Sequence, residues 1–99
     1  MTQQSQEQQI QVKADDVTLK GMYSNTANIL HTKEEFVLDF LSIFPPTGTL
    51  NARIIVSPGH MKRMVAAMSE NLKIYESQFG EVIAAAEIPK SSIGFEVRQ

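Results

Sequence analysis

The sequence predicts a small α+β domain, in which a four-stranded antiparallel sheet is followed by one long amphipathic helix. Residues 35–44 form a short apolar run, which is typical of a buried strand. Residues 57–80 carry apolar side chains at steps of three and four, as one face of a helix does. The connections between the predicted elements are short, and short connections favour antiparallel neighbours.

The first two strands are predicted from weaker patterns. Ile10, Val12 and Ala14 alternate with polar residues, which predicts a short half-buried strand over residues 10–14 that ends at two aspartates. Residues 22–31 form the second predicted strand. Neither of its faces is cleanly apolar, so we expect an edge position, a bulge or a contact surface there.

Residues 35–44 predict a central strand, because apolar side chains fall on both of its faces. Phe36, Leu38 and Phe40 lie on one face, and Val37, Leu41 and Ile43 lie on the other. A central strand needs cover on both sides. The single helix covers one face, so a second copy of the chain or the tail must cover the other. A loop is expected over residues 45–49, and the fourth strand over residues 50–56.

The helix has a start and a stop signal in the sequence. Ser57 is a suitable N-cap, Pro58 suits the first helical position, and Gly80 is typical of the residue that follows a helix. The apolar stripe lies on the predicted sheet or, in part, against the same helix of a second copy. The expected interface residues are Met61, Met64, Val65, Met68, Leu72, Tyr75 and Phe79.

The length and composition of the chain limit the number of domains and the kinds of function that we expect. The 99 residues allow one domain, predicted over residues 10–80, with a disordered Gln-rich start over residues 1–9 and a mostly irregular tail over residues 81–99. The net charge of −2 argues against binding to nucleic acid, and no basic run suggests a membrane surface. The chain has no cysteine and begins without a signal-peptide pattern, so we expect a cytoplasmic protein.

Residues suited to catalysis or metal binding are few. His31 and His60 are the only histidines, and their spacing matches no metal-binding motif, so we expect no metal and no cofactor. Ser24, His31 and Asp39 could be nominated as a nucleophile, a base and an orienting acid. Nothing in the pattern fixes their geometry, so the sequence favours a protein that is not an enzyme.

Asp39 interrupts an apolar face of the predicted central strand. A buried carboxylate needs a charged or hydrogen-bonding partner. Arg53 lies on the neighbouring predicted strand, and we predict a structural ion pair between the two residues. A further candidate is a weak anion site at the start of the helix, where free backbone N–H groups meet Gly59, His60, Lys62 and Arg63.

Several short motifs together resemble a family of small prokaryotic proteins known only as a domain of unknown function, family 3467. The matching motifs are Tyr23-Ser24-Asn25, His31, Glu35-Phe36, Leu38-Asp39-Phe40, Arg53, Ser57-Pro58, His60 and Tyr75 to Phe79-Gly80, and the resemblance covers about residues 8 to 81. The order of elements is also similar to that of the SecB-type export chaperones, which have four strands before a long helix and assemble into tetramers.

These observations favour a non-enzymatic module that associates with itself as a dimer or tetramer. The SecB similarity implies that other proteins could bind as clients. The alternative is a small domain that binds an anion or a nucleotide at the start of the helix.

Overall fold

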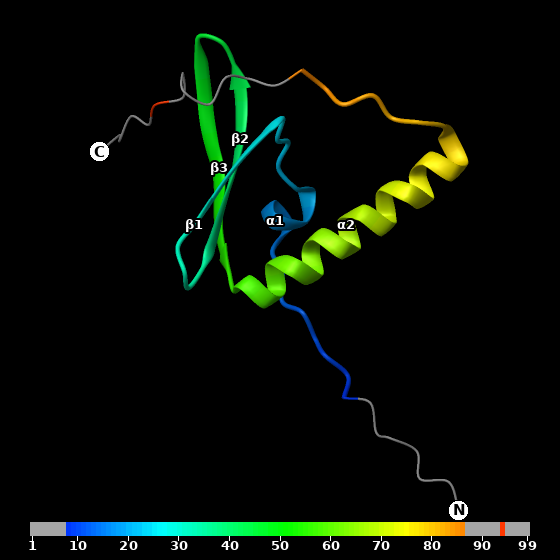
Figure 1. The fold of residues 1–99 in the computed structure, drawn as a ribbon. Coiled ribbons are helices and arrows are strands. Elements are labelled where there is room, and N and C mark those ends of the chain that lie inside the picture. Colours follow the sequence, from blue (N-terminus) through cyan, green and yellow to red (C-terminus); the bar gives the residue numbers. More distant parts are fainter. Residues whose placement is uncertain (1–7, 87–93, 95–99) are drawn as a thin grey trace, which may run out of the picture.

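The computed structural model describes residues 8–86 and residue 94. Three strands, β1 (Thr26–His31), β2 (Phe36–Phe44) and β3 (Thr47–Val56), form one antiparallel sheet in the order β1-β2-β3. A short helix, α1 (Asp16–Lys20), precedes the sheet, and a long helix, α2 (Pro58–Phe79), follows it (Figure 1). The α+β class and the antiparallel sheet are as predicted, but the sheet has three strands instead of four.

The predicted first strand is wrong, because the aspartates that follow residues 10–14 start a helix. The side chain of Asp15 accepts a hydrogen bond of 2.7 Å from the backbone N–H of Thr18, which caps α1. Gly21 ends the helix with a positive φ of 81°. Ile10 and Val12 are 84% and 85% exposed, and their alternating pattern has no neighbouring strand among residues 8–86.

Two strand boundaries also differ from the prediction. Strand β1 begins at Thr26 instead of residue 22, because residues 23–25 bond to β2 through side chains as well as backbone. Strand β3 begins at Thr47 instead of residue 50. Phe44 lies directly opposite Thr47, so the expected five-residue loop is a two-residue turn with a cis bond between Pro45 and Pro46.

The remaining predictions on domain limits fall partly outside the structure. Residues 1–7, which include most of the predicted disordered start, lie outside the described residues. So do residues 87–93 and 95–99 of the predicted irregular tail. Residues 81–86 are described and form neither helix nor strand.

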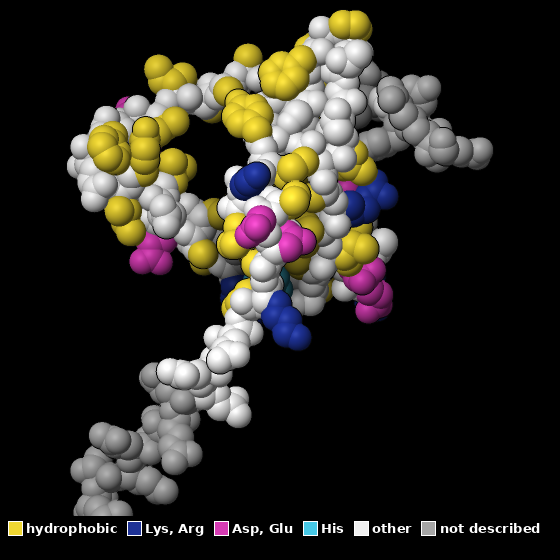
Figure 2. Space-filling view, turned by 180° about the vertical axis from the view of Figure 1, so that it is seen from behind, with side chains coloured by type: hydrophobic (Ala, Val, Ile, Leu, Met, Phe, Trp, Pro, Cys, Tyr) yellow, Lys and Arg dark blue, Asp and Glu magenta, His cyan; other side chains and the backbone are white. Residues whose placement is uncertain are grey.

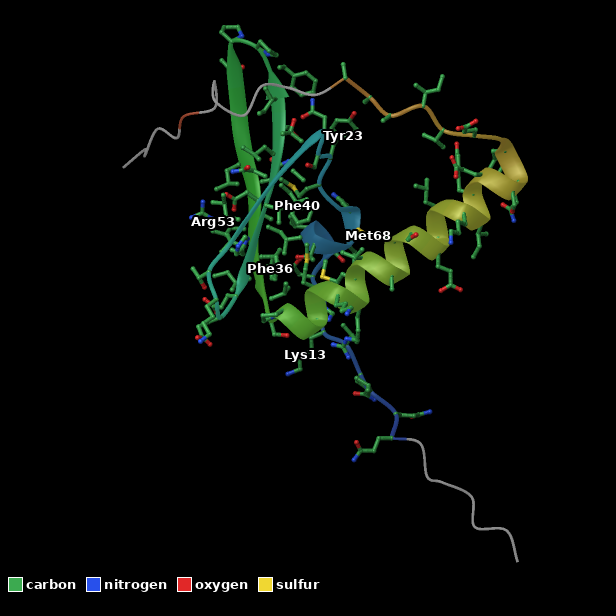
Figure 3. The ribbon with its side chains drawn as sticks, in the orientation of Figure 1. Lys13, Tyr23, Phe36, Phe40, Arg53 and Met68 are labelled. Atoms are coloured by element: carbon green, nitrogen blue, oxygen red, sulfur yellow. The ribbon has the colours of Figure 1, made fainter. Side chains whose placement is uncertain are left out.

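The register of the strands gives the sheet two different faces. On one, which we call the apolar face, the side chains are almost all hydrophobic: Ala27, Ile29, His31, Phe36, Leu38, Phe40, Ala52, Ile54 and Val56. Phe36 and Phe40 point to the side on which α1 lies, whereas Arg53 points away from it (Figure 3). The second face carries Asp39 and Arg53 among apolar neighbours, and we call it the Asp39 face.

Helix α2 leaves the end of β3 and diverges from the sheet (Figure 1). None of its residues is buried, and only Met61, Met64 and Glu76 are partly covered. Seen from behind, the molecule has an open gap beside α2, with hydrophobic side chains along its border (Figure 2). Helix α1 and the segment that follows it lie on the opposite edge of this gap, on the side toward the sheet (Figure 1). The interpretation in which the stripe of α2 lies along its own sheet is therefore wrong for the greater part of the helix.

Ser57 caps α2 as predicted, since its Oγ accepts a hydrogen bond of 3.1 Å from the N–H of His60. We expect Ser57→Ala to destabilise the helix by about 1 kcal/mol, because that N–H loses its acceptor. Thermal melting followed by far-UV circular dichroism measures the change. Ser77→Ala is the control, because the Ser77 hydroxyl donates to the Ile74 carbonyl and satisfies no N–H of the first turn. An equal loss in both variants contradicts the capping role.

Candidate protein-interaction surface

The Asp39–Arg53 contact is present, and it joins the two residues in direct register across β2 and β3. Nε of Arg53 donates to one carboxylate oxygen of Asp39 at 2.7 Å, and Nη2 donates to the other at 2.8 Å. The Asp39 side chain is fully buried, whereas that of Arg53 is 50% exposed. This two-bond geometry is the strongest that a guanidinium and a carboxylate can form.

The ion pair sets the charge of the buried group. The hydrogen bonds from Arg53 hold the pKa of Asp39 below its ordinary value, and the positive charge of Arg53 acts in the same direction. Burial opposes both effects, because it disfavours the charged carboxylate. Asp39 raises the pKa of Arg53 in turn. Asp39 is therefore ionised at neutral pH, and the pair is a fixed part of the Asp39 face.

A second polar cluster ties residues 23–25 to the sheet. The side-chain amide of Asn25 accepts from the N–H of Ile43 and donates to its carbonyl, both at 2.8 Å. Ser24 Oγ lies 2.9 Å from the carbonyl of Leu41. Asn25 thus bonds to β2 as a strand residue would, although it lies before β1 begins.

A bulge in β3 completes this cluster. Ala52 pairs with Phe40 and Leu50 with Leu41, so Asn51 is the extra residue between them. The Asn51 side chain donates to the carbonyl of Tyr23 and to Ser42 Oγ, at 2.5 and 2.8 Å. The pattern of residues 22–31 predicted an edge position, a bulge or a contact surface, and β1 does lie at an edge of the sheet. The bulge in β3 and the role of Asn51 were not predicted. The Tyr23-Ser24-Asn25 motif of the resemblance was the available signal.

The nominated catalytic residues are engaged in other contacts. Ser24 bonds to backbone carbonyls, and Asp39 bonds to Arg53. The ring of His31 lies against Phe36, with 5.4 Å between the ring centroids. In the part of the chain that the structure describes, no three His, Asp or Glu side chains are placed to hold a metal ion.

The predicted anion site lies at the exposed first turn of α2. Gly59, His60, Lys62 and Arg63 are all exposed. Arg63 Nη2 lies 2.8 Å from Nδ1 of His60, so the two predicted ligands bond to each other. The His60 N–H is already bonded to Ser57. Anion binding at this turn stays an untested prediction.

The predicted interface residues lie along α2 as one stripe. Val65, Met68, Leu72 and Tyr75 are about half exposed, and Phe79 is 71% exposed. Tyr75 and Phe79 lie in tilted contact, with 4.9 Å between their ring centroids. The helix therefore presents an apolar surface with an aromatic pair at its C-terminal end. It lies along one side of the open gap seen in Figure 2.

These features define a small α+β domain with exposed apolar surfaces on a helix and on a sheet. The chain belongs to the family described as protein of unknown function (DUF3467), whose model matches residues 1–84. This match is longer than the resemblance over residues 8 to 81 and includes the start of the chain. No curated protein and no solved structure matches the chain.

The similarity to SecB-type chaperones loses its basis, because it requires four strands and the sheet has three. As for membranes, no helix among the described residues has the length and apolar character needed to cross a bilayer.

Replacement of Asp39 tests the ion pair. We expect Asp39→Asn to lower the free energy of unfolding by about 2 kcal/mol near neutral pH, because Arg53 loses its charged acceptor. Urea unfolding of the full chain measures the loss at a fixed protein concentration. Asp16→Asn is the matched control, since it removes the same charge from exposed helix α1.

The lowered pKa of Asp39 also predicts how the effect of Asp39→Asn on stability changes with pH. The pKa of Asp39 is lower in the folded than in the unfolded chain, so its stabilising effect is present above the unfolded value. The effect is lost as the pH falls through the lowered folded value. The parent protein and Asp39→Asn should therefore differ less in their free energy of unfolding as the solution becomes more acidic. If the difference in the free energy of unfolding stays constant from neutral pH into acid, the lowered pKa assigned to Asp39 is contradicted.

Proposed function

We propose that the protein is a non-enzymatic interaction module that associates with itself through the stripe of α2 and the apolar face of the sheet. The observation that carries this proposal is the exposure of α2, a 22-residue helix with no buried residue. Most helix stability in proteins comes from packing of an apolar face. A second copy can supply that packing.

The sheet supports the same proposal. Among the described residues, only Leu38 and Leu41 are buried hydrophobic side chains. Ile29 and Ile54 on the apolar face remain 45% and 48% exposed. Exposed apolar surfaces of this extent mark interaction sites in folded proteins. Self-association can cover the helix and the sheet, because each leaves apolar side chains exposed.

The native mass in solution tests this proposal. Light scattering behind a sizing column, with the full chain at micromolar concentration, should give a mass of at least two copies. A mass of one copy at all concentrations overturns self-association. The exposed surfaces would then require a different protein, and capture of client proteins would be the next experiment.

A substitution within the stripe identifies the surface that associates. We expect Leu72→Lys to raise the dissociation constant about tenfold or more, because it places a charge in an apolar contact. Analytical ultracentrifugation over a concentration series measures this change. Ser77→Lys is the control, since it adds the same charge on the opposite side of α2. An unchanged constant for Leu72→Lys removes α2 from the interface.

A further inference from the structure

The spacing of the apolar stripe defines how two copies of α2 can pair. Successive stripe residues are separated by four, three, four, three and four positions, as a and d positions of a coiled coil are. The a positions are Val65, Leu72 and Phe79, and the d positions are Met61, Met68 and Tyr75. This assignment places Lys62 and Glu76 at e positions, beside the stripe.

In a parallel pair of α2 helices, the core and flanking residues would be poorly matched. Each core residue would meet its own copy, so Phe79 would face Phe79 at one end and Met61 would face Met61 at the other. The flanking contacts run from g to the following e position. Glu76 would meet Asn71, and Lys62 would meet no carboxylate. A parallel pair therefore gains no ion pair between the helices.

An antiparallel pair matches both shape and charge. Each a position then faces a d position of the partner, so Phe79 faces Met61, Tyr75 faces Val65 and Leu72 faces Met68. A large side chain meets a smaller or more flexible one in the outer layers, and methionine sulfur packs well on aromatic rings. At the e positions Lys62 faces Glu76, and the two-fold symmetry repeats this contact at the other end.

The side chain of Glu76 is already held in place for such a contact. One carboxylate oxygen accepts a hydrogen bond of 2.9 Å from the N–H of Val82, just after α2 ends. Glu76 is partly covered, whereas Lys62 is exposed. A carboxylate has acceptor capacity beyond this one bond, so a lysine of the partner can bind it. Opposite charges at paired positions set orientation and register in helical interfaces.

We propose that α2 pairs with α2 of a second copy in antiparallel orientation, in the register that sets Lys62 beside the partner's Glu76. This inference rests on the proposed self-association and adds its geometry. The contact is isologous, so it closes as a two-fold dimer and does not propagate into a filament.

The exposed apolar area of α2 is close to what a helix pair needs, and the sheet can add further contact area. The exposed parts of the five most exposed stripe residues amount to on the order of 500 Å² per copy, or about 1,000 Å² for the pair. Specific interfaces bury upward of roughly 1,000 Å² in total. The helix pair alone lies at this lower bound, and contact with the apolar face of the sheet adds to it.

Charge reversal tests the register. Lys62→Glu and Glu76→Lys should each raise the dissociation constant about tenfold, because both ends of the antiparallel pair then hold like charges. An equimolar mixture of the two variants should restore tight pairing, since each copy complements the other. The double variant K62E/E76K should pair as the parent does. A mixture that associates no better than the separate variants overturns the register.

Cysteine cross-linking tests the orientation. The chain has no cysteine of its own, so introduced thiols are the only ones present. Met61→Cys and Phe79→Cys should each fail to cross-link alone, because equivalent positions lie about 27 Å apart in the antiparallel pair. A mixture of the two should form a disulfide-linked heterodimer under mild oxidation.

The cross-linking result, together with the native mass, also distinguishes a failure of the antiparallel pair from a failure of self-association. Cross-linking of either variant with itself, in a protein that light scattering shows to be a dimer, overturns the antiparallel pair and leaves self-association intact. A protein of one-copy mass that forms no cross-link overturns both.

Discussion

Strand β2 carries apolar side chains on both of its faces, and the described chain covers each face only in part. Leu38 on one face and Leu41 on the other are 3% exposed, but Ile54 and Ile55, which lie on the same two faces in β3, stay about half exposed. Burial of apolar surface is the main favourable term in folding, at about 25 cal/mol per Å². The proposed second copy would remove part of this apolar surface from water.

The Asp39–Arg53 pair shows how the Asp39 face tolerates a charge in the middle of β2. Arg53 neutralises the buried carboxylate and satisfies both of its oxygens, while its own half-exposed side chain keeps contact with water. Removal of one partner from a buried pair is costly, whereas the intact pair contributes little net stability. The pair joins β2 and β3 in direct register, a few residues before β3 leads into α2.

Long, periodic segments were predictable from sequence, and short ones were not. The predicted bounds of the helix over residues 57–80 and of the central strand agree with the structure to within a residue or two, because capping residues and apolar runs mark them clearly. The Asp39–Arg53 contact followed from a charge in an apolar strand. Residues 10–14 failed because alternation alone does not supply a neighbouring strand, and Asp15 starts a helix as readily as it ends a strand.

Contacts made by polar side chains to distant backbone could not be read from the chain. Asn25 bonds to Ile43 of β2 across 18 positions of sequence, and Asn51 in the bulge of β3 bonds to the carbonyl of Tyr23, before β1, across 28 positions. Asparagine is common in turns and loops, so its presence alone does not indicate such a role. The path of α2 away from the sheet was equally hidden, because an apolar stripe looks the same whether it covers its own sheet or a second copy.

The dependence of thermal stability on protein concentration tests most directly whether a second copy completes the core. When folding and association are coupled, the midpoint of unfolding rises with concentration. Scanning calorimetry from about ten to several hundred micromolar should therefore show a steady increase in Tm. A Tm that does not change across this range would mean that each chain is stable by itself and that its exposed apolar surfaces contribute nothing to its own fold.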